Sequence, residues 1–480
     1  MVNQLHVRFL DFIFLGGKKM NANKKAKSVL AALLAGMMVF ASACNQGTTN
    51  SSEPAGDSSA AEESDQQESS EGTSEKSHIL FWDMAWGGPD TYIPAMEEVL
   101  SAVNSEFADQ LDGEIEYVNL PWDNFYQVHL TAVNSGTAPD IFAAGYGTAE
   151  LFARMGEIYY LDNLDADEEF ASKFSEAIWN SRRYEGRLVQ VPYLLGIDML
   201  YYRTDMFAEV GYTESPKTWD EFMDALRKVK EKYNIDPFIF DLSGSLASHL
   251  ALMSLINNGT GVCKYDAENN VVSAMSDENA LHMYDYWIQM YQEGLVPKSL
   301  SSYKRTDLTK IYLDGQAAVV IYDMPQDLAA DPEIAAVTGV MDVLTGPDTD
   351  EKRACTFING IGVFAQCKNP QLAEQICKSI VVNSQPIFTN AESGKWPTYE
   401  GLSVSEDFAF AKEGSKILDY MTPATYPIPE VYDGWSVIDG EALLGKVAQM
   451  AFTGASSDPA EIGAYGDELV QDAIVSQQNQ

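Results

Sequence analysis

Aromatic and acidic side chains that follow short apolar runs are the residues of this sequence best suited to holding a solute. Asp83 and Trp86 follow the run Ile79–Trp82, and Asp241 follows Phe238–Phe240. The remaining candidates of these two types are Tyr146, Tyr322, Asp323, Trp396 and Trp435. Aromatic rings pack on apolar CH groups and carboxylates accept hydrogen bonds from hydroxyl groups, so this set suits a ligand such as a sugar.

Each aromatic residue can instead belong to the core, since aromatic residues make up 11% of the chain. Trp82 and Trp219 fit that alternative, because they lie on an expected strand and on an expected helix face. Trp86 precedes a Gly-Gly-Pro loop and Trp435 follows an Asp-Gly turn, where a core role is less natural. We therefore predict that Trp86 and Trp435 lie at the binding site and stack on the solute.

Sequence patterns of common enzymes are missing. The sequence contains no G-x-x-x-x-G-K-[ST], no H-E-x-x-H and no G-x-S-x-G. Asp162, Asp165 and Asp167 are spaced like part of a calcium loop, but its glycine and closing Glu are absent. Among 71 acidic residues, a glycosidase-like carboxylate pair cannot be told from chance. We expect a binding protein without metal or cofactor, and an extracellular glycoside hydrolase remains the alternative.

The start of the chain has the order of a bacterial export signal. Three lysines within 24–27 precede the uncharged apolar run Val29–Phe40, and small side chains follow before Cys44. The run is too short to span a membrane. We expect 1–43 to be leader and signal peptide. Met20 is the expected start, because the codons of the preceding Gly-Gly-Lys-Lys can form a purine run like a ribosome-binding site.

Residues Phe40–Cys44 resemble the lipobox of bacterial lipoproteins, in which the cysteine thiol takes a diacylglyceryl group. Ala41 stands where that motif favours Leu. Two acyl chains anchor a protein stably, whereas one chain does so only marginally. The tract 45–77 has no Val, Ile, Leu, Met or aromatic residue, so we expect a disordered acidic tether. The sequence therefore predicts lipid anchoring at Cys44, with the chain facing the extracytoplasmic side of the cell membrane.

Strand-like and helix-like patterns alternate after the tether. The apolar runs Ile79–Trp82, Ile115–Val118 and Ile141–Ala144 alternate with helical faces over Tyr92–Phe107 and Phe125–Val133. This order predicts a parallel sheet covered by helices. The remaining length exceeds what one core usually holds, which favours two lobes.

The balance of charges and the cysteine spacing narrow the class of partner. The chain has 31 Lys and Arg against 71 Asp and Glu. Nucleic acids need a basic face, so we expect no nucleic-acid partner. Four cysteines follow Cys44 without C-x-x-C spacing: Cys263, Cys355, Cys367 and Cys377. Their spacing suggests no zinc site, and it favours buried free thiols while leaving a disulfide open.

Several segments occur together in an order typical of one family. They are Ala138–Phe142 (APDIF), Tyr184–Tyr193 (YEGRLVQVPY), Leu200–Phe207 (LYYRTDMF), Pro216–Phe222 (PKTWDEF), Leu313–Val319 (LDGQAAV) and Gly394–Pro397 (GKWP). This ordered set resembles the extracellular solute-binding proteins of family 1, which include maltose- and multiple-sugar-binding proteins. Arg203 departs from the pattern, since the family favours Asn there.

The resemblance implies an α/β fold of the two-lobed periplasmic-binding-protein type (type II), with a ligand cleft between lobes that close by a hinge. Lobe 1 would comprise 78–191 plus 323–357, and lobe 2 would comprise 192–322 plus 358–480. The chain would cross between the lobes near Pro192–Ile197, Ala318–Tyr322 and Thr356–Gly362. Gly360 and Gly362 suit a place where backbone angles change.

The resemblance also implies a function. The chain would capture a mono- or oligosaccharide outside the cell and deliver it to an ABC permease and its ATPase. It would act as a monomer that meets the membrane only through its lipid. The family places ligand-binding side chains on loops after strands, where the candidates above lie. A receptor for a peptide, a polyol or a phosphate ester is the alternative.

Overall fold

The computed structural model describes residues 76–122, 125–145, 147–243, 245–322, 325–390, 393–406 and 410–478. The expected signal peptide, Cys44 and nearly all of the expected tether lie outside the described residues, as do Tyr146 and Asp323. None of the helices in these ranges combines the length and the hydrophobicity that a bilayer span requires.

The larger of the two main sheets has eight strands and contains the three strands predicted first. Its main path runs β15-β7-β14-β3-β1-β2, and β4 and β16 both pair with β14. The strands are β1 (Leu80–Met84), β2 (Glu116–Leu120), β3 (Ile141–Ala144), β4 (Ile158–Tyr159), β7 (Val191–Ile197), β14 (Ala354–Phe364), β15 (Trp396–Pro397) and β16 (Met421–Pro423). β1 is parallel to β2 and to β3, which confirms the predicted parallel arrangement.

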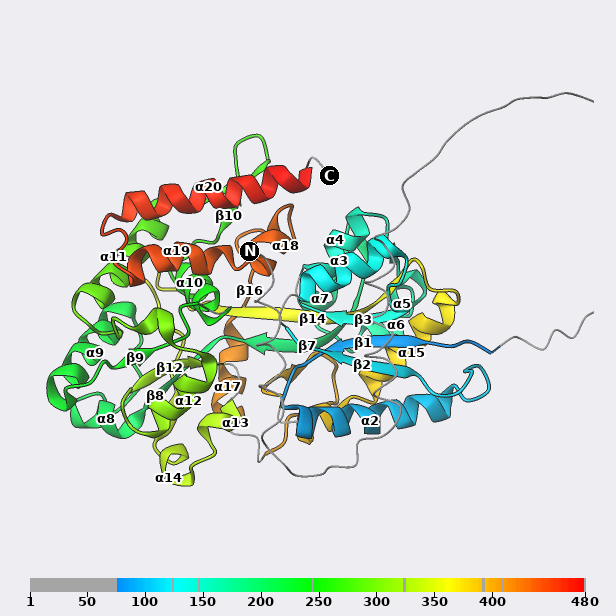
Figure 1. Cartoon of the computed structure of the whole chain (residues 1–480), viewed down its shortest axis with the longest axis horizontal. Helices are drawn as coiled ribbons and strands as arrows, with labels where there is room; N and C mark the ends of the chain where they lie inside the picture. The colour runs from blue at the N-terminus through cyan, green and yellow to red at the C-terminus, as the bar shows by residue number, and fades with distance from the viewer. Residues whose placement is uncertain are drawn as a thin grey trace, which may run out of the picture. The chain divides into compact units, whose positions relative to one another are not determined.

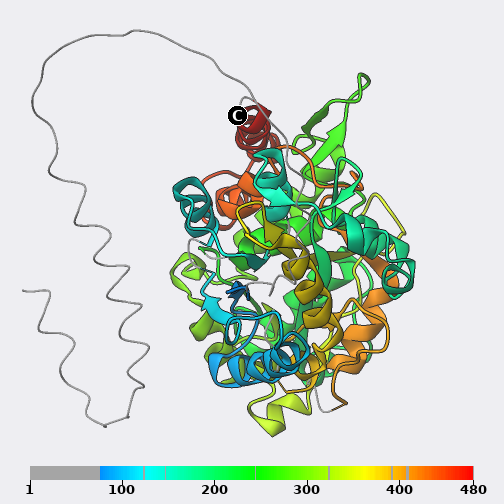
Figure 2. The ribbon, with the colours of Figure 1, turned by 90° about the vertical axis from the view of Figure 1, so that its right-hand side faces the viewer.

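Helices cover both faces of this sheet because alternate side chains of β3 point to opposite sides. Ile141 and Ala143 join one core with residues of α2 (Pro89–Glu106) and α15 (Pro370–Val382). Phe142 and Ala144 join a second core with residues of α3 (Phe125–Ser135) and α4 (Thr148–Arg154). Figure 1 shows α2 below the sheet and α3 with α4 above it. In Figure 2 the blue α2 lies next to the olive-yellow α15.

The smaller main sheet has four strands in the order β13-β8-β12-β9. They are β8 (Met199–Arg203), β9 (Phe238–Ile239), β12 (Val319–Tyr322) and β13 (Thr338–Val340). β12 is antiparallel to β8 and parallel to β9. The accompanying helices include α9 (Trp219–Tyr233), α10 (Ser245–Asn257), α11 (Glu278–Gln292), α12 (Arg305–Leu313), α19 (Leu443–Phe452) and α20 (Pro459–Gln478). Figure 1 shows the two sheets with β7 and β14 running between them.

Side chains cap the helices α9 and α15, and a glycine follows the end of α11. The Thr218 hydroxyl oxygen caps α9 by accepting a hydrogen bond from the Glu221 backbone N–H at 3.1 Å. The Glu221 carboxylate accepts from the Lys217 N–H rather than from that of Thr218, so only half of a capping box forms. Asn369 caps α15, and Gly294 follows the end of α11 with φ of +66°.

The chain passes between the two sheets at places that only partly match the prediction. The first passage is at Asp198, directly after the predicted range Pro192–Ile197. The second lies between β13 and β14, and after β16 the chain continues to α19 and α20, which pack on α10 and α11. The crossing predicted at Ala318–Tyr322 is wrong, because β12 and β13 both pair with β8.

The strand pairing also differs from the expected lobe boundaries. Within 323–357, expected in lobe 1, β13 pairs with β8 in the smaller sheet. Residues 358–364, expected in lobe 2, belong to β14 and pair with β3 and β7 in the larger sheet. A short apolar run does not reveal which strand it will pair with, so the sequence could not fix either assignment.

Gly360 has a packing role in the structure. A Cβ atom at this position would lie 2.6 Å from the Cβ of Gln190, so the glycine permits the close approach of β14 to β7. The register of this strand pair shifts between Asn359 and Gly360. Whether the position also serves as a hinge stays a prediction.

The four cysteines of the described chain are buried free thiols, the interpretation that their spacing favours: Cys263, Cys355, Cys367 and Cys377. Burial raises the pKa of Cys263 and of Cys367 to about 12. Burial also raises the pKa of Cys355 and of Cys377 well above the ordinary value of a thiol. All four thiols therefore stay protonated at neutral pH.

Candidate functional site

The aromatic edge cluster, which consists of Trp86, Trp122 and Phe125, lies where the parallel strands β1 and β2 end. The Trp86 and Trp122 ring centroids are 4.8 Å apart with the rings edge to face, and Trp122 meets Phe125 in the same way at 5.2 Å. The Trp122 Nε1 donates to the Ala85 carbonyl at 2.8 Å, which fixes the indole. Trp122 is 38% exposed. Ligands of α/β sheets bind at this carboxyl edge, so Trp122 offers a platform there.

The Asp83 carboxylate supports this cluster from inside the protein. It is fully buried and accepts hydrogen bonds from Trp86 Nε1 at 2.8 Å, Tyr92 OH at 2.8 Å and Tyr117 OH at 3.1 Å. The Met84 backbone N–H donates a fourth bond at 2.9 Å. Burial raises the Asp83 pKa to about 6, although the four donors oppose the shift. Asp83 therefore positions Trp86, and all of these contacts are internal.

The two tryptophans predicted to stack on the solute are both covered in this structure. Trp86 is 4% exposed and Trp435 is 1% exposed. A Cβ atom on Gly147 would lie 2.5 Å from the Trp435 ring, so that glycine lets the backbone pack directly on the indole. Trp435 begins α18 (Trp435–Gly440) and also meets Tyr432 at 5.7 Å. The expectation that a core role is unnatural at these positions is wrong, since both side chains are buried, and at Trp435 the glycine at position 147 allows the close packing.

Tyr322 and its neighbours lie at the end of β12 in the smaller sheet. The buried Tyr322 hydroxyl is 2.9 Å from the Thr309 hydroxyl and donates to Asp327 at 3.0 Å. The Arg305 guanidinium lies 5.4 Å from the centre of the Tyr322 ring. Tyr322 thus packs its ring beneath a cation instead of presenting it openly.

Asp241 lies close by, because β9 and β12 are parallel and end at the same edge. It is buried and accepts a hydrogen bond from the Leu246 N–H at 3.1 Å. Burial raises the Asp241 pKa to about 6, and the charges of Arg305 and His249 oppose this shift. The fold therefore brings Asp241 and Tyr322 to the same edge, where the Arg305 guanidinium lies over the Tyr322 ring and its charge acts on Asp241.

Trp396, also predicted at the site, faces the interior. It is buried on β15, opposite Leu195 of β7. A Cβ atom on Gly414 would lie 2.5 Å from its ring, and its Nε1 donates to the Ser415 hydroxyl at 3.3 Å. Trp396 therefore packs against α17 (Ala411–Ile417). Because neighbouring side chains of an extended chain point to opposite sides, Lys395 points away from α17.

The crossing cluster, which consists of Asp198, His249, Lys395 and Asp439, surrounds the point where the chain passes from β7 to β8. His249 Nδ1 lies 2.9 Å from Asp198 Oδ1, and its ring stacks on Phe357 of β14 with centroids 5.0 Å apart. Burial lowers the Lys395 pKa to about 8 and raises the Asp439 pKa to about 6. Burial also acts to lower the His249 pKa, but the charge of Asp198 raises it above its ordinary value.

The family can now be assigned. Residues 93–376, more than half of the chain, match the model of the bacterial extracellular solute-binding protein family. The chain belongs to this family. The resemblance found in the sequence motifs is thereby confirmed, and the family supports a binding role rather than a catalytic one.

Two characterised relatives resemble this solute-binding protein in sequence. It is 22% identical over 422 residues to the diacetylchitobiose binding protein DasA of Streptomyces coelicolor, across 87% of this chain and 91% of DasA. It is 28% identical over 166 residues to the arabinooligosaccharide-binding protein of Halalkalibacterium halodurans, across 34% of this chain and 35% of that protein.

Solved structures show the same architecture. A sugar transporter from Arthrobacter chlorophenolicus with bound laminaribiose superposes with a TM-score of 0.69 at 21% identity, across 82% of this chain and 99% of that one. The GacH receptor of Streptomyces glaucescens superposes with a TM-score of 0.66 at 18% identity, across 83% and 99%. The predicted two-lobed α/β fold is confirmed for this solute-binding protein.

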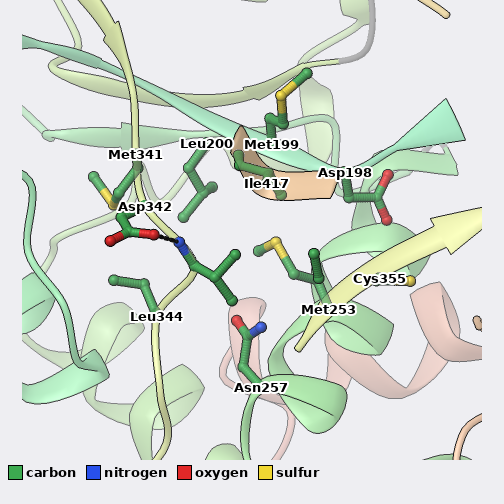
Figure 3. A pocket seen from close by; sticks show the side chains of 12 residues that line it. Asp198, Met199, Leu200, Met253, Asn257, Met341, Asp342, Leu344, Cys355 and Ile417 are labelled. Atoms are coloured by element: carbon green, nitrogen blue, oxygen red, sulfur yellow. Dashed lines mark hydrogen bonds between the residues drawn. The ribbon is translucent and has the colours of Figure 1, made fainter. Parts of the chain in front are cut away.

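A pocket beside the crossing of this solute-binding protein does not suit a polar ligand. Figure 3 shows it lined mainly by apolar side chains, among them Leu200 and Met253. The Asp198 carboxylate lies at the rim and points away from both. Without convergent polar groups, this pocket offers no recognition of hydroxyl groups.

Some residues of the candidate site were not identified from the sequence of this solute-binding protein. Trp122 follows the strand that ends at Leu120, so the strand-then-aromatic signal used for Trp86 could have found it. Asp198, His249 and Asp439 carry no such signal, because they lie far apart in sequence and meet only through the fold.

Proposed function

We propose that this chain is the lipid-anchored receptor of an ABC importer. We propose further that the receptor binds a carbohydrate outside the cell and delivers this carbohydrate to the permease. The aromatic edge cluster, with Trp122 partly exposed at the carboxyl edge of β2, is the observation that supports a sugar most directly. An exposed indole face packs on the CH groups of a pyranose ring. Asp241 and Tyr322 would contribute from the smaller sheet. Two sequence relatives are named for the saccharides that they bind, and a structural neighbour holds laminaribiose.

Calorimetric titration tests the ligand class. The panel comprises diacetylchitobiose, laminaribiose, maltose and arabino-oligosaccharides, with a tripeptide, a polyol and a sugar phosphate as non-saccharide or charged comparisons. We expect one or more neutral saccharides to bind with micromolar affinity, about −8 kcal/mol. Binding of the tripeptide or the polyol alone would overturn the carbohydrate proposal.

Trp122→Ala should weaken saccharide binding by about tenfold or more, because truncating an aromatic anchor commonly costs ~2 kcal/mol. Thermal stability should change little, since the ring is 38% exposed. Tyr265→Ala is the matched control, because Tyr265 is an aromatic residue that is 39% exposed on β10 (Cys263–Tyr265) and belongs to neither cluster. Unchanged affinity of the Trp122 variant in the presence of normal folding would remove Trp122 from the site.

Cys44→Ser should move the protein from the membrane fraction into the medium or a soluble fraction, because the substituted chain cannot take the diacylglyceryl group. The measurement is fractionation of cells followed by mass spectrometry of the mature N-terminus. The wild type should begin at an acylated Cys44. A wild-type N-terminus found elsewhere, without lipid, would exclude the anchor.

A further inference from the structure

We infer that the crossing cluster, Asp198, His249, Lys395 and Asp439, forms the polar pocket that recognises the hydroxyl groups of one sugar unit of the ligand. The inference rests on the proposed carbohydrate function and assigns specificity to four residues that are not among the site residues predicted from the sequence.

The four side chains reach one place from four different elements. Asp198 lies between β7 and β8, His249 lies on α10, Lys395 precedes β15, and Asp439 lies on α18. Lys395 passes over Gly196, where a Cβ atom would lie 3.8 Å from its Nζ. The charges of Lys395 and Asp439 both interact with Asp198 and His249.

Hydrogen-bonding capacity at this place is left unused. The Asp198 side chain is only 5% exposed, yet its Oδ2 has no hydrogen-bond partner among the described residues. Lys395 and Asp439 are half-buried, and within the same ranges no hydrogen bond or ion pair holds their side chains. Buried polar groups in folded proteins nearly always have partners, so unpaired groups that converge indicate a ligand.

The types of these groups define the ligand. Lys395 and His249 donate hydrogen bonds, while Asp198 and Asp439 accept them. A hydroxyl group both donates and accepts, so neighbouring hydroxyls of a sugar satisfy such a set. An anion would face two carboxylates and a cation would face Lys395, so the set favours an uncharged ligand.

The position of α18 connects this pocket with the aromatic edge cluster. Gly440, next to Asp439, lies against Tyr126 of α3, where a Cβ atom would be 3.6 Å from the ring. Phe125 of the aromatic edge cluster precedes Tyr126 on the same helix. The helix α18, which carries Asp439, therefore lies against the helix that carries Phe125.

Lys395→Met and Asp439→Asn test the pocket by titration with laminaribiose, maltose and diacetylchitobiose. Each variant should bind the saccharide preferred by the wild type about tenfold more weakly or worse, because hydroxyl groups lose a buried partner. The melting temperature should change little, because both side chains are half-buried and neither holds a hydrogen bond within the described residues. Lys412→Met and Asp472→Asn are the controls, since both positions are exposed.

Monodeoxy analogues of the preferred disaccharide sharpen the test. The wild type should discriminate against one deoxy position by about tenfold or more, and the matching variant should not. A wild type that binds a saccharide while both variants bind it equally well would overturn the pocket alone. A drop in melting temperature that parallels the loss of affinity would also overturn the pocket, because the residues would then have a structural role. A wild type that binds no saccharide would overturn the proposed function itself.

Discussion

Asp83→Ala is expected to lower the free energy of unfolding by at least about 3 kcal/mol. The substitution leaves the Trp86 Nε1 and the hydroxyls of Tyr92 and Tyr117 without their acceptor in the interior, and each unsatisfied buried donor costs about 1–3 kcal/mol. Urea unfolding followed by tryptophan fluorescence measures the change. Asp112→Ala, at an exposed position, should stay within about 0.5 kcal/mol of the wild type.

The effect of this substitution should depend on pH in a defined direction. The Asp83 pKa lies near 6 in the folded protein and near 3.8 in the unfolded chain. The folded state therefore holds the extra proton between these values, and the wild type loses stability as the pH rises through that window, by up to about 3 kcal/mol. The Ala variant lacks this titration, so its deficit should be larger at pH 4 than at pH 7. A deficit that grows with pH would contradict the buried carboxylate described here.

Trp435→Ala is expected to cost about 3–5 kcal/mol of stability, as large core truncations do. The indole is 1% exposed and packs directly on Gly147, so its removal opens a cavity that the short loop before α4 cannot readily close. Differential scanning calorimetry of the ligand-free variant measures the loss, and a saccharide titration separates it from affinity. Trp122→Ala provides the contrast, since it should lose affinity and keep stability. A Trp435 variant that melts like the wild type but binds poorly would return Trp435 to the ligand site.

The local elements of this fold were predictable from the sequence because their periodicity is strong. β1, β2 and β3 are short apolar runs, and α2 and α3 carry clear apolar faces, so their order and parallel pairing follow. The pairing of distant segments was not predictable. β13 is a short run that pairs with β8, and nothing within it specifies that partner.

For the candidate site, the sequence predicted where some residues lie in the fold but not how their side chains are oriented. Trp86 lies just past the carboxyl end of β1, as its place after an apolar run predicts, whereas Asp83 lies inside β1, one residue before its end. Their orientation is set by Tyr92 and Tyr117, which donate to Asp83 from a helix and a neighbouring strand. Lys395 and His249 meet at the crossing only after β7 and β14 have paired, so no spacing in the sequence could have joined them.

The four buried thiols have a practical consequence for studies of the protein in solution. A reagent that attacks thiolates finds almost none at these four positions in the native state, because burial both shields the sulfur atoms and raises their pKa values. Labelling must then wait for the chain to open locally. Cys355 and Cys377, both on or against the larger sheet, would report the opening of that region, and Cys263 would report the strand pair β10 and β11 (Val271–Ser273). Each of these cysteines can therefore report how often its own part of the native protein opens.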